Sequence, residues 1–189
     1  MQRLIMPVNN SIVSASYKNQ NYFKKFGFEH WGVDMYGSLN IYAQGYGVVI
    51  NAGSDTLYGN FVQVLYLDCE SSETGYLGHV VANYFHLNSV LVKTGQRTTK
   101  DTKLGLMGKT GKYATGVHLH LEMRIYVYEK FLNLSPFGSE NFIEDSTAFW
   151  FNPLSISHVK KSAPDSQTMF FSDETYTNIL DRKGVLYYE

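Results

Sequence analysis

Two short segments of the chain alternate polar and apolar residues with a period of two, over residues 30–35 and 117–122. Successive side chains of a β-strand point to opposite faces, so this period predicts two strands that are each buried on one face only. In the first segment Trp31, Val33 and Met35 alternate with His30, Gly32 and Asp34, so His30 and Asp34 share the polar face. In the second, Val117, Leu119 and Leu121 form the predicted core face, and His118, His120 and Glu122 form the polar face. Each segment therefore carries its titratable side chains on one sheet surface.

Glycine turn signals separate further runs of β-forming residues. Gly45 and Gly47 precede one run over residues 48–50, and Gly59-Asn60 precedes a second run over residues 61–67. This spacing predicts a hairpin or meander. The polar, acidic stretch 68–75 is typical of an exposed loop, and the apolar run that follows, over residues 80–87, carries His86. Residues 92–105 predict a turn, a short strand, a second turn and another strand.

Composition supports the same fold class. Tyrosine and phenylalanine are abundant, at 15 and 12 residues, whereas glycine is frequent at 16 and proline scarce at 4. This balance favours short strands and tight turns over long helices. We therefore predict an all-β fold, mainly an antiparallel sheet arranged as a sandwich or barrel-like assembly.

The length predicts one domain with appendages, because 189 residues with 44% hydrophobic content supply one good core. Residues 1–29 are predicted to be an N-terminal segment with a first short strand near residues 7–13 and a solvated turn at Lys24-Lys25. Residues 30–159 form the predicted central domain, and residues 160–189 a C-terminal appendage. Within the appendage, Ser172 followed by Asp173 and Glu174 predicts a short capped helix.

Charge and cysteine content exclude several classes of partner and site. The formal net charge of −1 gives no global field toward nucleic acid or an anionic membrane surface. Cys69 is the one cysteine, which excludes an intrachain disulfide and a zinc site built from several thiolates. No run approaches the roughly 18 apolar residues that a membrane span requires. The first residues show no standard export signal, which leaves a removed signal, delivery by a phage or an injection machine, or release by lysis.

The histidines and Asp34 have the spacing of metal ligands. Catalytic zinc sites use three protein ligands and keep one position open for water. His30 and Asp34 are four residues apart, and His118 and His120 are two apart. On a strand both spacings project side chains from one face, so each pair can converge on one point. The alternative for each pair alone is an ordinary hydrogen-bonded pair on a β face.

Four segments, in order, resemble the successive motifs of the lysostaphin/LytM peptidoglycan endopeptidases. They are HWGVDM at 30–35, YFHLNSVLVKTGQ at 84–96, GKTGKYATGVHLHLEM at 108–123 and FNPL at 151–154. The resemblance covers about residues 30–155. It implies an antiparallel β fold of the duplicated hybrid motif type, with a groove over the sheet. It also implies a hydrolase that acts on bacterial cell wall in an extracellular, periplasmic or cell-wall location.

The resemblance also implies roles for individual residues. His30, Asp34 and His120 would bind Zn²⁺, and His86 and His118 would act on the water and the developing oxyanion, with the division between them open. The substrate would be peptidoglycan peptide, with no nucleic acid partner and no membrane span. The resemblance names neither the bond that is cleaved nor the oligomeric state.

Other readings stay open. Glu122 could orient a ligand histidine, although a structural hydrogen bond or an ion pair with Arg124 is the simpler role, and Tyr22 or Tyr113 could stabilise the oxyanion instead of packing. One rival function is a cupin-like metalloenzyme. This alternative assigns no role to the upstream pair of His30 and Asp34. The other is a catalytically silent wall-binding or regulatory scaffold of the same fold, with an intact site blocked by part of residues 1–29.

Overall fold

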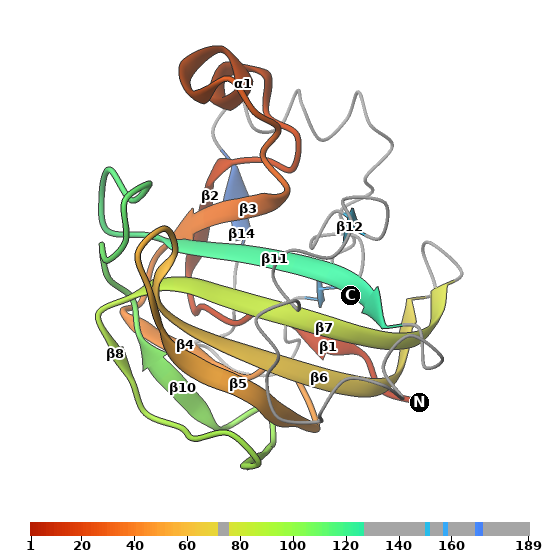
Figure 1. Ribbon diagram of the computed structural model, residues 1–189. Helices are drawn as coiled ribbons and strands as arrows, with labels where there is room; N and C mark the ends of the chain where they lie inside the picture. The colour runs from red at the N-terminus through yellow and green to blue at the C-terminus, as the bar shows by residue number, and fades with distance from the viewer. Residues whose placement is uncertain (72–75, 127–149, 152–156, 159–168, 172–189) are drawn as a thin grey trace.

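The computed structural model describes residues 1–71, 76–126, 150–151, 157–158 and 169–171, and shows a β protein with one short helix in these residues (Figure 1). The helix is α1 (Gln20–Phe26). The strands are β1 (Leu4–Ile5), β2 (Ser11–Ala15), β3 (Gly32–Tyr36), β4 (Asn40–Tyr42), β5 (Gly47–Asp55), β6 (Gly59–Ser71), β7 (Tyr76–Leu87), β8 (Ser89–Val90), β9 (Arg97–Thr98), β10 (Lys103–Leu106), β11 (Leu119–Tyr126), β12 (Trp150–Phe151), β13 (Ser157–His158) and β14 (Met169–Phe171).

One large sheet carries most of the strands, in the order β14-β2-β3-β11-β7-β6-β5-β9, with β12 also paired to β11. Its centre is the long hairpin of β6 and β7, and the first strand of this hairpin begins at Gly59. A smaller sheet has the order β4-β10-β8, and β1 pairs with β13. Within the described strands most pairings are antiparallel, and the exceptions are β1 with β13 and β2 with β14. The predicted all-β, mainly antiparallel fold is confirmed.

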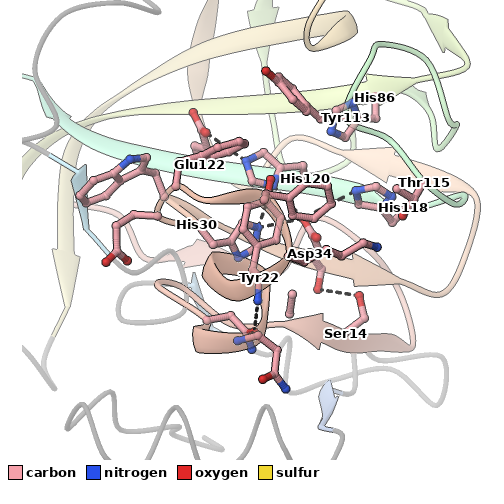
Figure 2. Close-up of a pocket in the computed structure, with 18 of the residues that line it drawn as sticks. Ser14, Tyr22, His30, Asp34, His86, Tyr113, Thr115, His118, His120 and Glu122 are labelled. Carbon is pink, nitrogen blue, oxygen red and sulfur yellow. Dashed lines mark hydrogen bonds and ion pairs between the residues drawn. The ribbon is translucent and has the colours of Figure 1, made fainter.

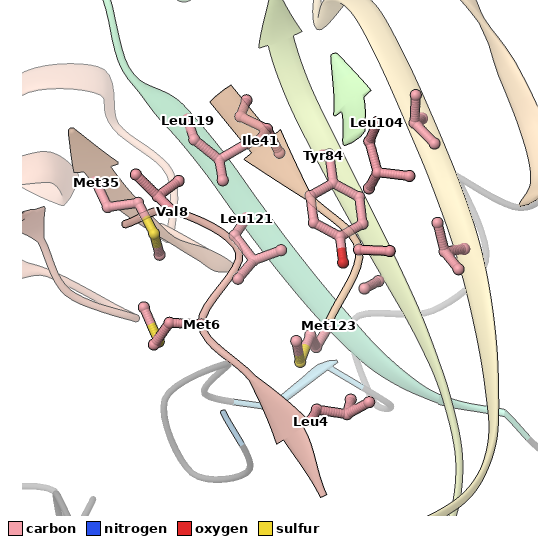
Figure 3. Packing of buried hydrophobic residues seen from close by; sticks show 14 of the residues in the cluster. Leu4, Met6, Val8, Met35, Ile41, Tyr84, Leu104, Leu119, Leu121 and Met123 are labelled. Carbon is pink, nitrogen blue, oxygen red and sulfur yellow. The ribbon is translucent and has the colours of Figure 1, made fainter. Parts of the chain in front are cut away.

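The main hydrophobic core lies between the large sheet and the smaller one (Figure 3). Leu119, Leu121 and Met123 point from β11 into this core, where they meet Ile41 of β4 and Leu104 of β10, and all five are fully buried. Because side chains alternate along β11, the residues between them face the other side of the sheet. The apolar half of the period-two pattern thus leaves His120 and Glu122 on the surface opposite the core.

The pairing of β3 with β11 brings distant parts of the polar pattern together. The two strands are antiparallel, with Asp34 opposite His120 and Gly32 opposite Glu122. Directly opposed residues of neighbouring strands share one face and lie about 5 Å apart. The register alone therefore places the Asp34 and His120 side chains beside each other.

Three local predictions are wrong. Lys24 and Lys25 lie in the last turn of α1 and not in a solvated turn, because Asn19 caps the helix start and Gly27, at φ 81°, ends it in the left-handed conformation. Residues 68–71 belong to β6 and not to a loop, since the hairpin continues past a bulge and buries Cys69. Val117 is 54% exposed because β11 begins only at Leu119.

Other predictions remain predictions. The division of the chain at residues 29 and 159 is one of them, and β2 from the N-terminal segment pairs with β3 of the central domain. The predicted helix after Ser172 lies outside the described residues, as do residues 152–154 of the last motif. Among the described residues, no helix has the length and apolar character needed to cross a bilayer.

Truncation of Leu121 tests the packing of β11. Leu121 is fully buried in the core, and Leu121→Ala is expected to lower the free energy of unfolding by about 3 kcal/mol through lost burial and the cavity left behind. Chemical denaturation of the metal-free protein measures this change. Leu91→Ala is the matched control, because Leu91 is 54% exposed, and its effect should stay within about 0.5 kcal/mol. Equal losses in the two variants would contradict this assignment of the core.

Candidate active site

A cavity of about 350 Å³ lies over the polar face of the large sheet (Figure 2). Its floor comes from β2, β3, β7 and β11. One wall is α1 with the residues that follow it, and the other is the loop of residues 109–117. The lining includes all five residues singled out in the sequence, which are His30, Asp34, His86, His118 and His120. The fold therefore gathers side chains from three distant segments in one groove.

Three potential ligand atoms converge at the centre of this groove. His30 Nε2 lies 3.1 Å from Asp34 Oδ1 and 3.1 Å from His120 Nδ1, and His120 Nδ1 lies 2.7 Å from Asp34 Oδ1. Three ligands of tetrahedral zinc, with bonds of 2.0–2.1 Å, are separated by roughly 3.3 Å. The triangle formed by the three atoms has nearly this size. Within the described residues, this is the histidine and carboxylate cluster that could hold a metal ion.

The second nitrogen of each of these two histidines is occupied by an acceptor. His30 Nδ1 lies 2.7 Å from the carbonyl oxygen of Ser16, so it donates its proton there. His120 Nε2 lies 3.0 Å from Glu122 Oε1 and donates to that carboxyl group. Metal-binding histidines in proteins are typically oriented in this way. With these tautomers, His30 Nε2 and His120 Nδ1 both direct lone pairs toward Asp34, and a cation satisfies all three atoms at once.

The electrostatics of the metal-free site agree with this arrangement. Although burial of Asp34 opposes its ionisation, the adjacent His30 and His120 hold the pKa of its carboxyl group well below the usual range. Burial likewise opposes protonation of His120, but hydrogen bonds to Asp34 and Glu122 raise its pKa to about 10. Without a metal, the protonated His120 ring bridges two carboxylates: Nδ1–H donates to Asp34 and Nε2–H donates to Glu122. A metal ion bound by His120 Nδ1 would displace the proton on that nitrogen, as metal binding to histidine generally requires.

Gly32 gives His120 the room for its ring. A Cβ atom on Gly32 would lie 2.8 Å from Cε1 and 2.9 Å from Nε2 of His120, and 2.5 Å from the carbonyl oxygen of Leu121. Real Cβ atoms do not approach other atoms so closely. The imidazole of His120 therefore lies over the bare backbone of Gly32 and reaches Glu122, which is opposite Gly32 on β11.

His86 and His118 lie next to the triangle of potential metal ligands formed by His30, Asp34 and His120. Their ring centroids are 5.0 Å apart, and His118 Nε2 lies 3.7 Å from Asp34 Oδ1. His86 Nδ1 donates to the carbonyl oxygen of Thr110, and His118 Nδ1 donates to that of Gly116, each at 2.9 Å. In the neutral form of each ring, these bonds leave the lone pair on Nε2. Burial, with the nearby His120 and His118, lowers the pKa of His86 to about 4, so its imidazole is neutral at physiological pH.

The backbone at His86 is in an unusual conformation. Its φ of 64° lies in the left-handed region, which non-glycine residues occupy at a cost of roughly 1–3 kcal/mol. The position is stabilised locally, because His86 N donates to the carbonyl of Tyr58 and its ring donates to that of Thr110. Strain of this kind is concentrated at functional positions.

The loop that carries Thr110 is fixed to the turn between β5 and β6. Thr110 Oγ1 donates to the carbonyl oxygen of Leu87 at 2.8 Å and accepts from Asn60 N at 2.9 Å. Gly59 and Gly111 pack backbone against backbone, and a Cβ on Gly111 would lie 2.5 Å from Gly59 N. The carbonyl group that orients His86 is therefore part of a rigid connection to the sheet.

Aromatic rings line the wall formed by α1. Tyr22 stacks on His30, with ring centroids 4.2 Å apart, and Phe28 contacts Tyr113 across the groove at 5.4 Å. Burial and the charges of Asp34 and Glu122 raise the pKa of Tyr22, so its hydroxyl stays protonated. Tyr22 and Tyr113 both lie in the groove lining, whereas His79 is outside it and pairs with Asp68.

Several residues of this site were not identified from the sequence. Ser16 and Thr110 act through their backbone carbonyl groups, and a carbonyl group leaves no signature of residue type. Gly32 had a readable signal, because a glycine stood at the one position on the polar face between His30 and Asp34. The need for a glycine there depends on the pairing of β3 with β11, which sets Glu122 opposite Gly32.

Comparison with known proteins gives a consistent result. The family model for Peptidase family M23 matches residues 28–133, more than half of the chain. A curated relative, peptidoglycan DD-endopeptidase ShyA of Vibrio cholerae, is 34% identical over 83 residues, which are 44% of this chain and 17% of that protein. The stretches that match the first three curated relatives make up 25%, 17% and 20% of their lengths.

Two solved structures share the fold at low sequence identity. A zinc-containing peptidase from Vibrio cholerae has a TM-score of 0.54 and 24% identity, over 66% of this chain and 37% of that chain. A chain of the SpoIIQ–SpoIIIAH pore-forming complex has a TM-score of 0.57 and 20% identity, over 83% of this chain and 92% of that chain. The matched family model includes every histidine of the groove, and the chain belongs to Peptidase family M23.

Proposed function

We propose that this chain is a zinc-dependent endopeptidase that hydrolyses peptide bonds in the cross-links or stem peptides of bacterial peptidoglycan. The observation that carries the proposal is the convergence of His30 Nε2, Asp34 Oδ1 and His120 Nδ1 within 3.1 Å of one another, with the second nitrogen of each histidine already donating to an acceptor. Similarity to ShyA supports the substrate class. Such a substrate places the site of action in the extracellular space, the periplasm or the cell wall.

His30, Asp34 and His120 would hold the metal. Bound there, zinc would supply a Lewis acid that lowers the pKa of a water molecule and polarises the scissile carbonyl group. Two imidazoles and one carboxylate leave a net charge of +1 at the site, which favours the negative charge that develops on the substrate. The three side chains line the groove (Figure 2), and the extended peptide would bind there.

Proton transfer is assigned to the two remaining histidines. His118 Nε2 lies 3.7 Å from Asp34 Oδ1, and its Nδ1 already donates to Gly116, so we assign Nε2 as the acceptor for the proton of the attacking water. The imidazole that has taken up this proton can then return one to the leaving amine. His86 is neutral and oriented by Thr110, and lies beside His118, where it supports the same transfer.

The first test combines metal removal with loss of His118. Purified protein is incubated with sacculi of several cross-link chemistries, as isolated, after chelation and after zinc is restored, and new free amines are followed by mass spectrometry. Amine release is expected to disappear on chelation and to return with zinc. His118→Ala should lower the rate by about 10²–10⁴-fold while zinc still binds, as expected for loss of general acid–base catalysis.

Two results would contradict the proposal. Zinc binding without amine release from any wall type would support a silent scaffold of this family. Failure to bind zinc at all would remove the proposed metal site. The fragments released from a responsive wall would identify the bond that is cleaved.

Thr110 offers a test of how His86 is positioned. Thr110→Val keeps the shape of the side chain but removes the hydroxyl that bonds Asn60 N and the carbonyl of Leu87. The loop should loosen and misplace the carbonyl group that holds His86, which is expected to lower kcat by about tenfold. Thr110→Ser keeps the hydroxyl and should retain most of the activity. Steady-state kinetics on a soluble cell-wall peptide, with zinc content measured in parallel, distinguishes the two variants, and equal kcat values would refute this role.

A further inference from the structure

A row of directly opposed residues runs across four strands beside the metal-ligand triangle. Gly32 of β3 is opposite Glu122 of β11, Glu122 is opposite Asn83 of β7, and Asn83 is opposite Gln63 of β6. Opposed residues share one face of the sheet. The row therefore lies on the surface that carries the active site, next to the row of Asp34 and His120.

Three of these residues are polar and buried. Asn83 and Gln63 are fully buried, and Glu122 is 6% exposed. Within the described residues, Asn83 Oδ1 and both amide atoms of Gln63 are buried without a hydrogen-bond partner. An unsatisfied buried polar group costs about 1–3 kcal/mol. Apolar side chains in this row would make the sheet more stable, so stability does not account for the amides.

Within the row, Glu122 is the residue that hydrogen-bonds to the proposed metal site. Glu122 Oε1 accepts from His120 Nε2 at 3.0 Å, and this bond directs His120 Nδ1 toward Asp34. The other carboxyl oxygen, Oε2, lies 3.5 Å from Asn83 Nδ2, close enough for a long hydrogen bond. Asn83 thus restrains the carboxyl group that orients a proposed metal ligand. Gln63 is one strand further away, and neither polar atom of its side chain has a hydrogen-bond partner in the described residues.

We infer that Glu122 and Asn83 are positioning residues that set the affinity of the metal site through His120. The inference rests on the proposed zinc site. Glu122 fixes the tautomer and the ring orientation of His120, and Asn83 keeps the Glu122 carboxyl group in the rotamer that reaches it. Gly32, which has no side chain, leaves space for the imidazole ring of His120 in this arrangement. Substitution of residues that orient a metal ligand typically costs 10–100-fold in metal affinity or activity.

The test measures zinc affinity and not turnover. Dissociation constants are determined by competition with a chromophoric chelator for the wild type and for Glu122→Gln, Asn83→Leu and Gln63→Leu. We expect zinc binding to weaken by about 10–100-fold for Glu122→Gln and by about tenfold for Asn83→Leu. Gln63→Leu is the matched control, since it removes an equally buried amide from the same row without touching Glu122, and its affinity should stay within about twofold of the wild type.

Two further measurements keep the outcome unambiguous. Thermal unfolding of the metal-free variants shows whether each is folded, and Asn83→Thr serves as a smaller replacement if the leucine is not accommodated. The visible spectrum of the cobalt-substituted protein should change in Glu122→Gln and Asn83→Leu and remain as in the wild type for Gln63→Leu, because only the first two alter the orientation of His120.

The possible failures are separable. A wild-type protein that does not bind zinc would overturn the proposed function together with this inference. A wild type that binds zinc, with Glu122→Gln unchanged or with Asn83→Leu and Gln63→Leu equally affected, would overturn the inference alone.

Discussion

The antiparallel pairing of β3 with β11 is the contact on which the active site depends. It places Asp34 directly opposite His120 and Gly32 opposite Glu122, so the backbone ladder brings together two proposed metal ligands that are 86 residues apart in the chain. Val33, Met35, Leu119 and Leu121 on the opposite face of the same strands are buried in the core, and their burial fixes the register. A slip of one residue would turn the histidines into the core, which makes the core and the site two consequences of one alignment.

Around this pairing, backbone carbonyl groups do much of the orienting. His30, His86 and His118 each donate Nδ1–H to a carbonyl oxygen, from Ser16, Thr110 and Gly116 respectively. His120 differs, because it binds a carboxyl side chain through Nε2 and presents Nδ1 to the groove. Three histidines are therefore held by the path of the chain, whereas the fourth depends on the identity of one side chain. Of the four histidines, His120 is therefore the one whose orientation a single substitution, at Glu122, would change most directly.

The strands of the site were predictable because a period of two is a local property of the sequence. Val33 and Met35 are buried as expected, and His120 and Glu122 lie on the opposite face. Helix α1 was missed because its seven residues are too few for a periodic signal and its formation depends on caps at Asn19 and Gly27. The partners of the histidines could not be predicted, since a carbonyl group such as that of Thr110 becomes a partner only through a contact across 24 residues of chain.

The two walls of the groove are attached to the sheet in different ways. The loop wall is joined through backbone contacts of Gly59 with Gly111, where no side chain fits between them. The helical wall rests on ring contacts of Tyr22 and on end caps, and none of the residues of α1 is buried. Changes of residue type in α1 therefore leave the floor of the groove intact, whereas the loop can vary only beyond Gly111. For the proposed endopeptidase, contacts that recognise the peptide substrate would therefore tolerate more substitutions on the helical side than on the loop side, which carries His118.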